Sequence, residues 1–159
     1  MKDPDSITIR RAEPSEHHSL SEIALAAKRH WGYPEEWIDQ WEAALTIAPE
    51  FVRANDVYVA TEHSRLLGFY GVVRGAQTAS LEHLWVRPEA MDRGVGRKLF
   101  ADAVSRARAG GAHTLTIDSD PNAEGFYLHA GARKTGEVAA SFAGVVRIRP
   151  QLEVVLGDP

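Results

Sequence analysis

The chain has 159 residues, of which 44% are hydrophobic and 25% charged, and its formal net charge is −4 at pH 7. These values predict a single soluble globular domain over residues 1–159, since domains usually run to roughly 100–200 residues. An acidic balance argues against nucleic-acid binding through the overall field, which is normally basic. Cysteine is absent, which excludes disulfides, cysteine-ligated metals and a cysteine nucleophile.

The N-terminus lacks the apolar run of a signal peptide, and no stretch of the sequence is apolar for long enough to span a bilayer. We therefore expect a cytoplasmic protein that neither enters a membrane nor binds nucleic acid.

The first part of the chain predicts a strand followed by two helices. Residues 6–10 alternate polar and apolar side chains, as a short strand does. Apolar residues then recur at helical spacing and predict a first helix to about residue 29. Gly32 interrupts this pattern. A second helix begins near Pro34, because proline has no N–H to leave unpaired in a first helical turn. Trp37 and Trp41 lie on one stripe of this helix and are interpreted as core residues.

The rest of the chain predicts strands interleaved with helices. The expected elements are, in order, strands at 57–61, 66–74 and 79–86, a helix at 94–109, a strand at 113–119, a helix at 122–130 and strands at 132–140 and 152–156. Short turns between successive strands imply antiparallel pairing, and the strand–helix–strand unit at 79–119 implies a parallel crossover. The predicted fold class is therefore mixed α/β (α+β), with a mostly antiparallel sheet of about six to seven strands and about four helices.

A glycine pair, Gly94 and Gly96, opens the clearest predicted helix. The first N–H groups of a helix have no internal partner and lie at the positive end of its dipole, so an anion can bind there. Arg93, Arg97 and Lys98 crowd this helix start, where cations are unfavourable unless an anion offsets them. The segment predicts a polyanion site; the alternative is a tight surface turn with solvated charges.

This segment resembles the acyl-CoA-binding motif of the GNAT (GCN5-related) N-acetyltransferase superfamily, commonly written Q/R-x-x-G-x-G/A after a strand of the form L-x-V-x-P. Leu84-Trp85-Val86-Arg87-Pro88 matches the strand end, and the two glycines match the motif. Met91 departs from the usual Gln or Arg. The resemblance implies that CoA contacts Leu84, Trp85, Val86, Met91, Asp92, Arg93, Gly94, Val95, Gly96 and Arg97.

A second match lies downstream, where Asn122, the pair Phe126-Tyr127 and Gly131 resemble the last helix of the same superfamily. In that family the asparagine contacts the pantetheine or phosphate arm of CoA, and the tyrosine hydroxyl reaches the thioester sulfur. The resemblance implies that Asn122, Phe126 and Tyr127 bind the cofactor, with Tyr127 as the general acid.

The reaction also needs a general base and an acceptor site. Glu82 lies on the strand where the superfamily often places a carboxylate, although it could equally be a satisfied surface charge. His83, on the opposite face of a regular strand, is the second catalytic candidate. By resemblance, Trp31 and Tyr33 line the acceptor cleft together with Glu82.

The expected function is therefore an acetyl-CoA-dependent N-acetyltransferase (EC 2.3.1.-), which uses acetyl-CoA as co-substrate and no metal. It would move the acetyl group to a primary amine of a small molecule or peptide by direct transfer. One alternative is a non-catalytic acyl-CoA sensor or partner-binding module, and another is a phosphate-binding module unrelated to CoA. Dimerisation is common in the superfamily, so a homodimer is a further expectation.

Overall fold

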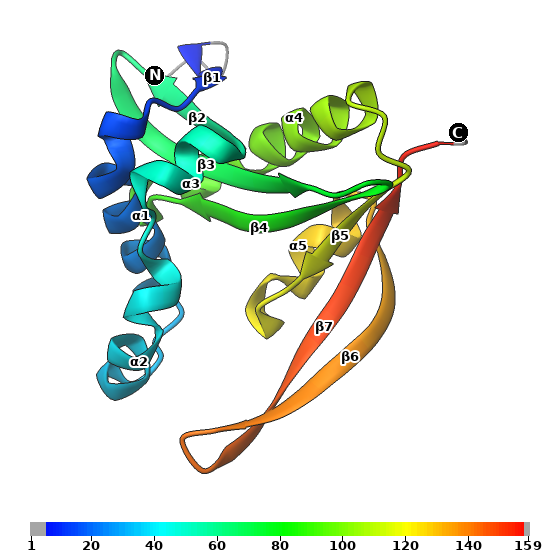
Figure 1. Cartoon of the computed structure of the whole chain (residues 1–159). Helices are drawn as coiled ribbons and strands as arrows, with labels where there is room; N and C mark the ends of the chain where they lie inside the picture. The colour runs from blue at the N-terminus through cyan, green and yellow to red at the C-terminus, as the bar shows by residue number, and fades with distance from the viewer. Residues whose placement is uncertain (1–5, 158–159) are drawn as a thin grey trace. The chain divides into compact units, whose positions relative to one another are not determined.

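The computed structural model describes residues 6–157 and shows a mixed α/β fold (Figure 1). Its strands are β1 (Thr8–Arg11), β2 (Asp56–Glu62), β3 (Arg65–Arg74), β4 (Thr78–Val86), β5 (Thr114–Asp118), β6 (Arg133–Phe142) and β7 (Val145–Val155). Its α-helices are α1 (His17–His30), α2 (Glu35–Leu45), α3 (Pro49–Ala54), α4 (Val95–Ala109) and α5 (Glu124–His129). Short 3-10 helices are η2 (Pro14–Glu16), η3 (Pro88–Arg93) and η4 (Pro121–Ala123).

The strands form a seven-stranded sheet in the order β1-β2-β3-β4-β5-β7-β6. β4 and β5 are parallel, whereas β1 with β2, β2 with β3, β5 with β7 and β6 with β7 are antiparallel. The predicted mixed, mostly antiparallel class is confirmed, with the parallel crossover where the sequence indicates it. Among residues 6–157, α3 and the 3-10 helices add to the four helices expected.

The final hairpin is longer than its sequence pattern predicts. β7 begins at Val145 rather than at residue 152, directly after the turn residues Ala143 and Gly144. Both turn residues have positive φ, 51° and 78°, and such a pair matches the twist of a tight two-residue hairpin. Alanine rarely adopts positive φ, so this turn carried no clear signal in the sequence.

The chain forms two compact units. The first consists of the described part of Met1–Val72 together with His83–Asp102, and the second of Val73–Glu82 with the described part of Ala103–Pro159. The domain extent of residues 1–159 stays a prediction, since residues 1–5 and 158–159 lie outside the described part.

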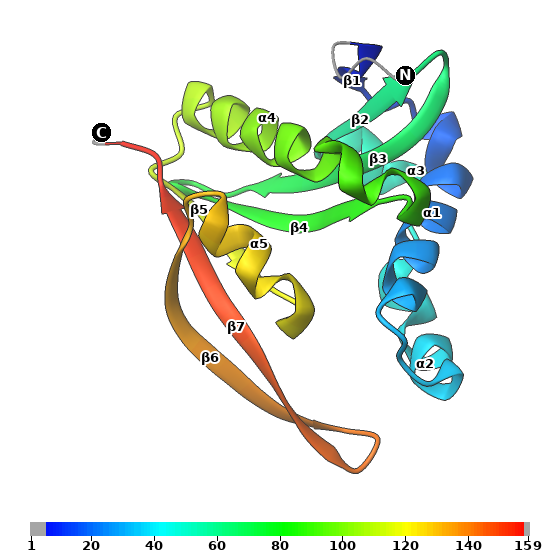
Figure 2. The same cartoon turned by 180° about the vertical axis from the view of Figure 1, so that it is seen from behind.

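The first unit packs helices against β2 and β3. Its core includes Leu20 and Ile23 of α1, Val52 of α3 and Phe69 of β3, all fully buried. α3 lies in front of β3 in Figure 1, and the start of α4 lies in front of it in the reverse view of Figure 2.

Two glycines of β3 allow this close packing. A Cβ at Gly71 would lie 2.9 Å from the ring of Phe51 on α3, and one at Gly68 would lie 3.2 Å from Leu99 of α4 and 2.6 Å from the Trp85 carbonyl oxygen of β4. Both glycines are therefore required by neighbours that approach the strand closely.

The second unit contains β5, α5 and the β6–β7 hairpin. Leu115 and Ile117 of β5 pair with Val154 and Leu152 of β7, and Leu115, Ile117 and Leu152 are buried. The far part of the hairpin extends away from β5 as a two-stranded arm (Figure 1). Within residues 6–157, no helix has both the length and the apolar character that crossing a membrane requires.

Candidate active site

The loop between β4 and α4 is fastened to β3 by backbone and side-chain hydrogen bonds. The N–H of Arg87 donates to the carbonyl of Leu67 at 2.8 Å, and its Nε donates to the carbonyl of Leu66 at 2.6 Å. The 3-10 helix η3 (Pro88–Arg93) follows, and its residue Ala90 is buried. The Arg87 hydrogen bonds and the buried Ala90 therefore fix the position of the segment that leads into α4.

Gly94 stands between η3 and α4 in the left-handed conformation, with φ of +77°. A Cβ at this position would meet nothing within 4 Å, so the backbone faces open space. The next residue, Val95, is fully buried and anchors the first turn of α4. An open, fixed helix start with unpaired N–H groups has the chemistry to hold a phosphate group.

The three cations at this helix start have different roles. Arg93 binds both carboxylate oxygens of the buried Glu62, at 3.0 and 2.5 Å, and this hydrogen-bonded contact raises the pKa of the Arg93 guanidinium. Lys98 donates its Nζ to the carbonyl of Ile7 at 2.9 Å. Arg97 is exposed, and it forms no ion pair with any residue that the structure describes. Of the three, Arg97 is the cation best placed to meet a phosphate.

The other residues predicted to contact CoA in this segment lie at the end of β4, in η3 and in the first turn of α4. Leu84, Val86 and Met91 are half-buried, Gly96 lies within the first turn of α4, and Asp92 is exposed. Met91 has no polar hydrogen to donate, so any anion binding here depends on backbone N–H groups and Arg97.

His83 and Trp85 of β4 form a hydrogen-bonded pair on one face of the strand. The indole N–H of Trp85 donates to Nδ1 of His83 at 3.0 Å, which leaves the imidazole proton on Nε2. Phe51 and Phe69 contact the imidazole, with ring centroids 5.5 and 6.0 Å away. Burial in this aromatic pocket lowers the pKa of His83 to about 4, so the ring is neutral at pH 7.

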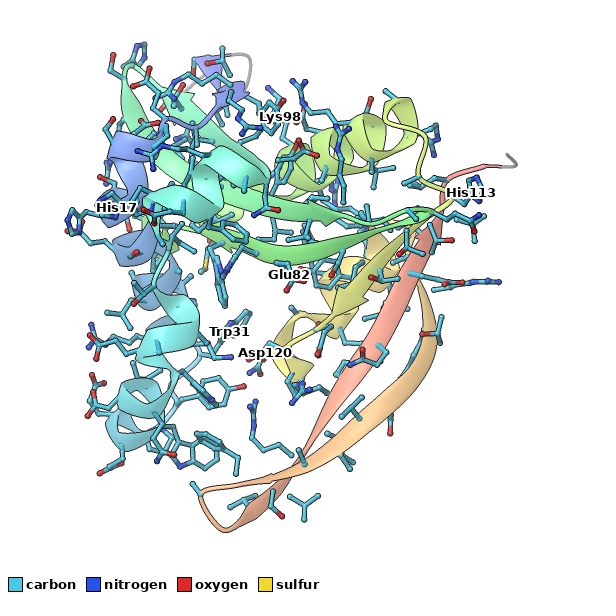
Figure 3. All side chains as sticks on the ribbon, viewed as in Figure 1. His17, Trp31, Glu82, Lys98, His113 and Asp120 are labelled. Carbon is cyan, nitrogen blue, oxygen red and sulfur yellow. The ribbon has the colours of Figure 1, made fainter. Side chains whose placement is uncertain are left out.

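Trp31 and Tyr33 lie in the connection between α1 and α2. Gly32 between them has φ of +80° and turns the chain. The Trp31 side chain, labelled in Figure 3, is 41% exposed. Its ring meets the ring of His30 edge-on, with the centroids 6.0 Å apart. Tyr33 is half-buried and turns toward Trp41 of α2, with ring centroids 4.9 Å apart.

In the second unit, a polar face runs across β4, β5 and β7. Ser80 pairs in register with Thr116, and because side chains alternate along a strand, Glu82 and Asp118 lie on the same face. Glu82 is exposed and accepts a hydrogen bond from the Ser80 hydroxyl at 3.0 Å.

Asp118 is held by two side chains of β7. Arg149 donates to its oxygens at 3.0 and 3.3 Å, and Gln151 donates to Oδ1 at 3.0 Å. The negative charge of Asp118 is therefore balanced by the Arg149 guanidinium, whereas Glu82 accepts a hydrogen bond from an uncharged hydroxyl.

Asp120 organises the segment that leads into α5. Its side chain accepts hydrogen bonds from the backbone N–H and from Nδ2 of Asn122, at 2.8 and 3.0 Å. Arg147 of β7 lies 3.9 Å from the other oxygen. Asn122 is thereby held at the start of η4, while its own side chain remains exposed.

Tyr127 is buried within α5, next to Phe126, whose ring meets it edge-on at 5.2 Å. Burial raises the pKa of Tyr127, and the negative charge of Asp120 raises it further. The phenol is therefore protonated at neutral pH and can act as a proton donor.

The predicted site residues thus fall into two groups. The first unit contains the helix start at Gly94, the His83–Trp85 pair and the aromatic residues Trp31 and Tyr33. The second unit contains the proton-transfer candidates Glu82 and Tyr127, together with Asn122 and Phe126.

Sequence reasoning missed the residues that hold these groups in place: Glu62, Asp118, Asp120, Arg147, Arg149 and Gln151. Two alternating pairs were the available signal. Asp118 and Asp120 stand at the end of a strand and just after it, and Arg147 and Arg149 are spaced in the same way near the C-terminus. Among residues 6–157, no group of three or more His, Asp or Glu side chains could hold a metal ion.

The family of the chain is decided by a match to the acetyltransferase (GNAT) domain model over residues 23–153. The chain belongs to the GNAT acetyltransferase family. No curated protein matches the chain. The resemblance seen in the sequence is therefore confirmed at the level of the family.

Solved structures of other GNAT proteins share the fold. A GCN5-related N-acetyltransferase from Rhodopseudomonas palustris is 23% identical with a TM-score of 0.77, covering 94% of this chain and 95% of its own. The acetyltransferase yncA from Salmonella typhimurium, solved with acetyl-CoA, is 21% identical with a TM-score of 0.73, covering 96% and 95%. The PaiA N-acetyltransferase from Thermoplasma acidophilum, in complex with coenzyme A, is 21% identical with a TM-score of 0.72, covering 94% and 98%. At these identities the likeness establishes the GNAT fold alone.

Proposed function

We propose that the chain is an acetyl-CoA-dependent N-acetyltransferase that acetylates a primary amine by direct transfer. The observation that carries the proposal is the open, left-handed turn at Gly94 before α4, within the segment that the GNAT model matches. Related folds have been solved with acetyl-CoA and with coenzyme A, which supports the same ligand here.

The residues around Gly94 fit the phosphates of CoA. The first N–H groups of α4 and the Arg97 guanidinium supply donors for phosphate oxygens. Arg93 acts indirectly, because its guanidinium is bound to Glu62 and so fixes the loop that precedes the turn. Asn122 and Phe126 are the proposed contacts for the pantetheine arm in the second unit.

Glu82 is the proposed general base. An acceptor amine is protonated at neutral pH, so the ammonium ion must lose a proton before its nitrogen can attack. Glu82 is exposed, and the Ser80 hydroxyl binds Oε1, which leaves Oε2 to accept that proton directly or through a water. The second candidate, His83, is less suited because its Nδ1 accepts the Trp85 N–H and burial opposes its protonation.

Tyr127 is the proposed general acid. Bound acetyl-CoA supplies an activated acetyl group, and transfer forms a C–N bond as the C–S bond breaks. The sulfur that leaves carries the electron pair of that bond, and the Tyr127 hydroxyl gives it a proton. The raised pKa keeps this proton on the phenol at neutral pH, so the group is in the correct state when the reaction begins.

The proposal is tested by incubating the protein with acetyl-CoA and a panel of amines, with thiol release and acetylated product both measured. The panel should include polyamines, amino acids and peptides with free N-termini. We expect transfer to at least one amine, and Glu82→Gln should lower kcat/KM for that amine about 100-fold. Tight CoA binding without transfer to any amine would contradict the proposal and favour an acyl-CoA sensor.

A matched control is available on the same polar face of the second unit. Glu153 of β7 is a carboxylate bound by the Arg133 guanidinium, with Nε 2.9 Å away. Glu153→Gln should leave kcat/KM within about threefold of wild type, because a carboxylate already paired with arginine is not needed as a base. Equal losses in both variants would remove Glu82 from the role of base.

A further inference from the structure

The end of α1, the connection that follows it and α2 bring three aromatic rings and a lysine together. Lys28 of α1 places its ammonium group 4.3 Å from the ring centre of Trp41 and 5.1 Å from that of Tyr33. These two rings are nearly perpendicular, at 84°, with their centres 4.9 Å apart. Two ring faces therefore meet around one cation, and we call Tyr33, Trp37 and Trp41 the aromatic corner.

The third ring supports the other two. Trp37 stacks on Tyr33 at 5.9 Å with an interplanar angle of 26°, and it meets Trp41 edge-on at 5.9 Å. Trp41 also packs against the core of the first unit, so the corner is fixed to the fold. All three rings are half-buried, and partial loss of water strengthens the attraction between a cation and a ring face.

The same chain contains a plainer contact of this kind for comparison. Arg11 lies over the Tyr58 ring at 5.7 Å, and Tyr58 stacks on Tyr70 in a nearly parallel arrangement. A single ring face meets a cation there, whereas Lys28 meets two. An exposed pair of one ring and one cation contributes little to binding or stability. The Lys28 ammonium, by contrast, lies over two nearly perpendicular rings, and a single cation–ring contact does not account for this arrangement.

We infer that the aromatic corner is a recognition site for an organic ammonium ion, with Lys28 as its resident and displaceable occupant. The Lys28 ammonium shows which charge the corner accepts. Its flexible four-carbon stem loses rotamer freedom when the ammonium is held between the rings, so an external alkylammonium ion of similar shape can compete for the place. The ligand class is a primary to quaternary alkylammonium group. That this cation belongs to the acceptor rests on the proposed function, whereas cation binding itself does not.

The binding test uses tetramethylammonium, which carries the required charge and cannot be acetylated, in the absence of acetyl-CoA. The chain has four tryptophans, so indole N–H signals in a nitrogen-15 NMR spectrum report on each one. We expect saturable shifts of the Trp37 and Trp41 signals, and no shift of the Trp85 signal on β4. An equal response of all four signals would overturn the inference.

Two variants decide whether Lys28 occupies the site. Lys28→Met keeps the length of the side chain and removes its charge, so it should tighten tetramethylammonium binding by about 5-fold or more. Lys134→Met, which removes an ammonium paired with Glu124 and Glu137, should leave the affinity unchanged. If Lys28→Met binds no more tightly than wild type, Lys28 is only a structural contact and the inference fails.

The need for charge and for the rings is tested on the Lys28→Met background. Tert-butanol, a neutral molecule of similar size, should bind at least 5-fold more weakly than tetramethylammonium. Adding Trp41→Leu should abolish the shifts of Trp37, and Tyr33→Leu serves as the second ring variant if Trp41→Leu does not fold. Retained binding in the folded double variants would overturn the inference. Because these measurements involve no acetyl transfer, an inactive protein can still pass them and an active one can fail them.

Discussion

Arg93 and Glu62 form a two-point ion pair beneath the proposed phosphate site, with Nη1 to Oε1 at 3.0 Å and Nη2 to Oε2 at 2.5 Å. Ser6 adds a third donor, its hydroxyl lying 2.5 Å from Oε2. Glu62 is only 7% exposed, so it depends on these donors to offset the loss of water. Arg93, which directly precedes the first glycine of the motif, therefore stabilises the loop before α4.

Glu62→Gln should destabilise the fold while leaving CoA binding nearly intact. A hydrogen bond to a charged group contributes roughly 1.5–3 kcal/mol, and each kcal/mol shifts Tm by about 2–4 °C in a chain of this size. We expect thermal unfolding, followed by circular dichroism, to show a fall of about 5 °C. The dissociation constant for CoA, measured by calorimetry, should stay within about threefold.

The same loop provides the control for this variant. Glu89 of η3 pairs with Arg65 at 2.6 Å, and both side chains are more than half exposed. Surface ion pairs contribute little, since solvent screens them, so Glu89→Gln should shift Tm by less than about 2 °C. Equal shifts in the two variants would show that burial of Glu62 does not matter.

Arg97→Ala should weaken CoA binding without affecting stability. Its exposed side chain at the start of α4 has no ion pair to lose within residues 6–157, while one charge-assisted contact to phosphate is worth a factor of about 10 in affinity. Calorimetry at low and moderate salt should show this loss shrinking as salt rises, because screening weakens the contact in the wild type. Arg53→Ala, which removes an exposed arginine of α3, should change nothing; a similar loss there would point to a general charge effect.

Much of the fold followed from local patterns in the sequence. The mostly apolar stretches of β2 and β3, and the apolar row at Val95, Leu99 and Ala103 of α4, predict elements whose observed bounds differ by a residue or two. These signals are strong because β2 and β3 are largely buried and α4 buries one face. The arm formed by β6 and β7 was the weak point, since most of its residues are exposed and its turn relies on Ala143 at positive φ.

The residues of the two motifs could be predicted from the sequence, but the ion-pair and hydrogen-bond partners that hold the site could not. Gly94 and Tyr127 lie within contiguous motifs, so a resemblance alone could locate them. The partners Glu62 and Arg93 are 31 positions apart in the chain, and Asp120 and Arg147 are likewise distant. Such pairs depend on strand register and loop path, which a single sequence does not specify. The interpretation of Trp41 as core was incomplete, because its ring also faces Lys28.

Tyr127→Phe should lower kcat with little effect on the binding of acetyl-CoA. Removal of one hydroxyl leaves the packing of the ring in α5 unchanged but removes the proton for the leaving sulfur, and general acids typically contribute a factor of 100 or more. Steady-state kinetics should show kcat falling about 100-fold and KM for acetyl-CoA within about threefold. Tyr58→Phe on β2 is the matched control and should leave kcat unchanged. An undiminished kcat in Tyr127→Phe would exclude the acid role.

The half-buried imidazole of His83, enclosed by Phe51 and Phe69, should make the protein less stable in mild acid. Burial lowers the pKa of His83 from its ordinary value of 6.5 to about 4 in the folded chain, so between these pH values the unfolded chain binds the proton more readily. This contribution to stability is complete above about pH 6.5 and is lost as the pH falls toward 4. By pH 4.5 the loss from this one group should be about 2 to 3 kcal/mol.

Urea unfolding at pH 7.5, 6.5, 5.5 and 4.5 should therefore show that the free energy of unfolding declines less for His83→Gln than for the wild type. Glutamine keeps an acceptor for the Trp85 N–H but does not titrate. His129→Gln on the exposed surface of α5 should decline as the wild type does. Parallel declines in all three proteins would mean that His83 takes up its proton as easily in the folded chain as in the unfolded one, and the hydrogen bond from Trp85 would then have to break without cost.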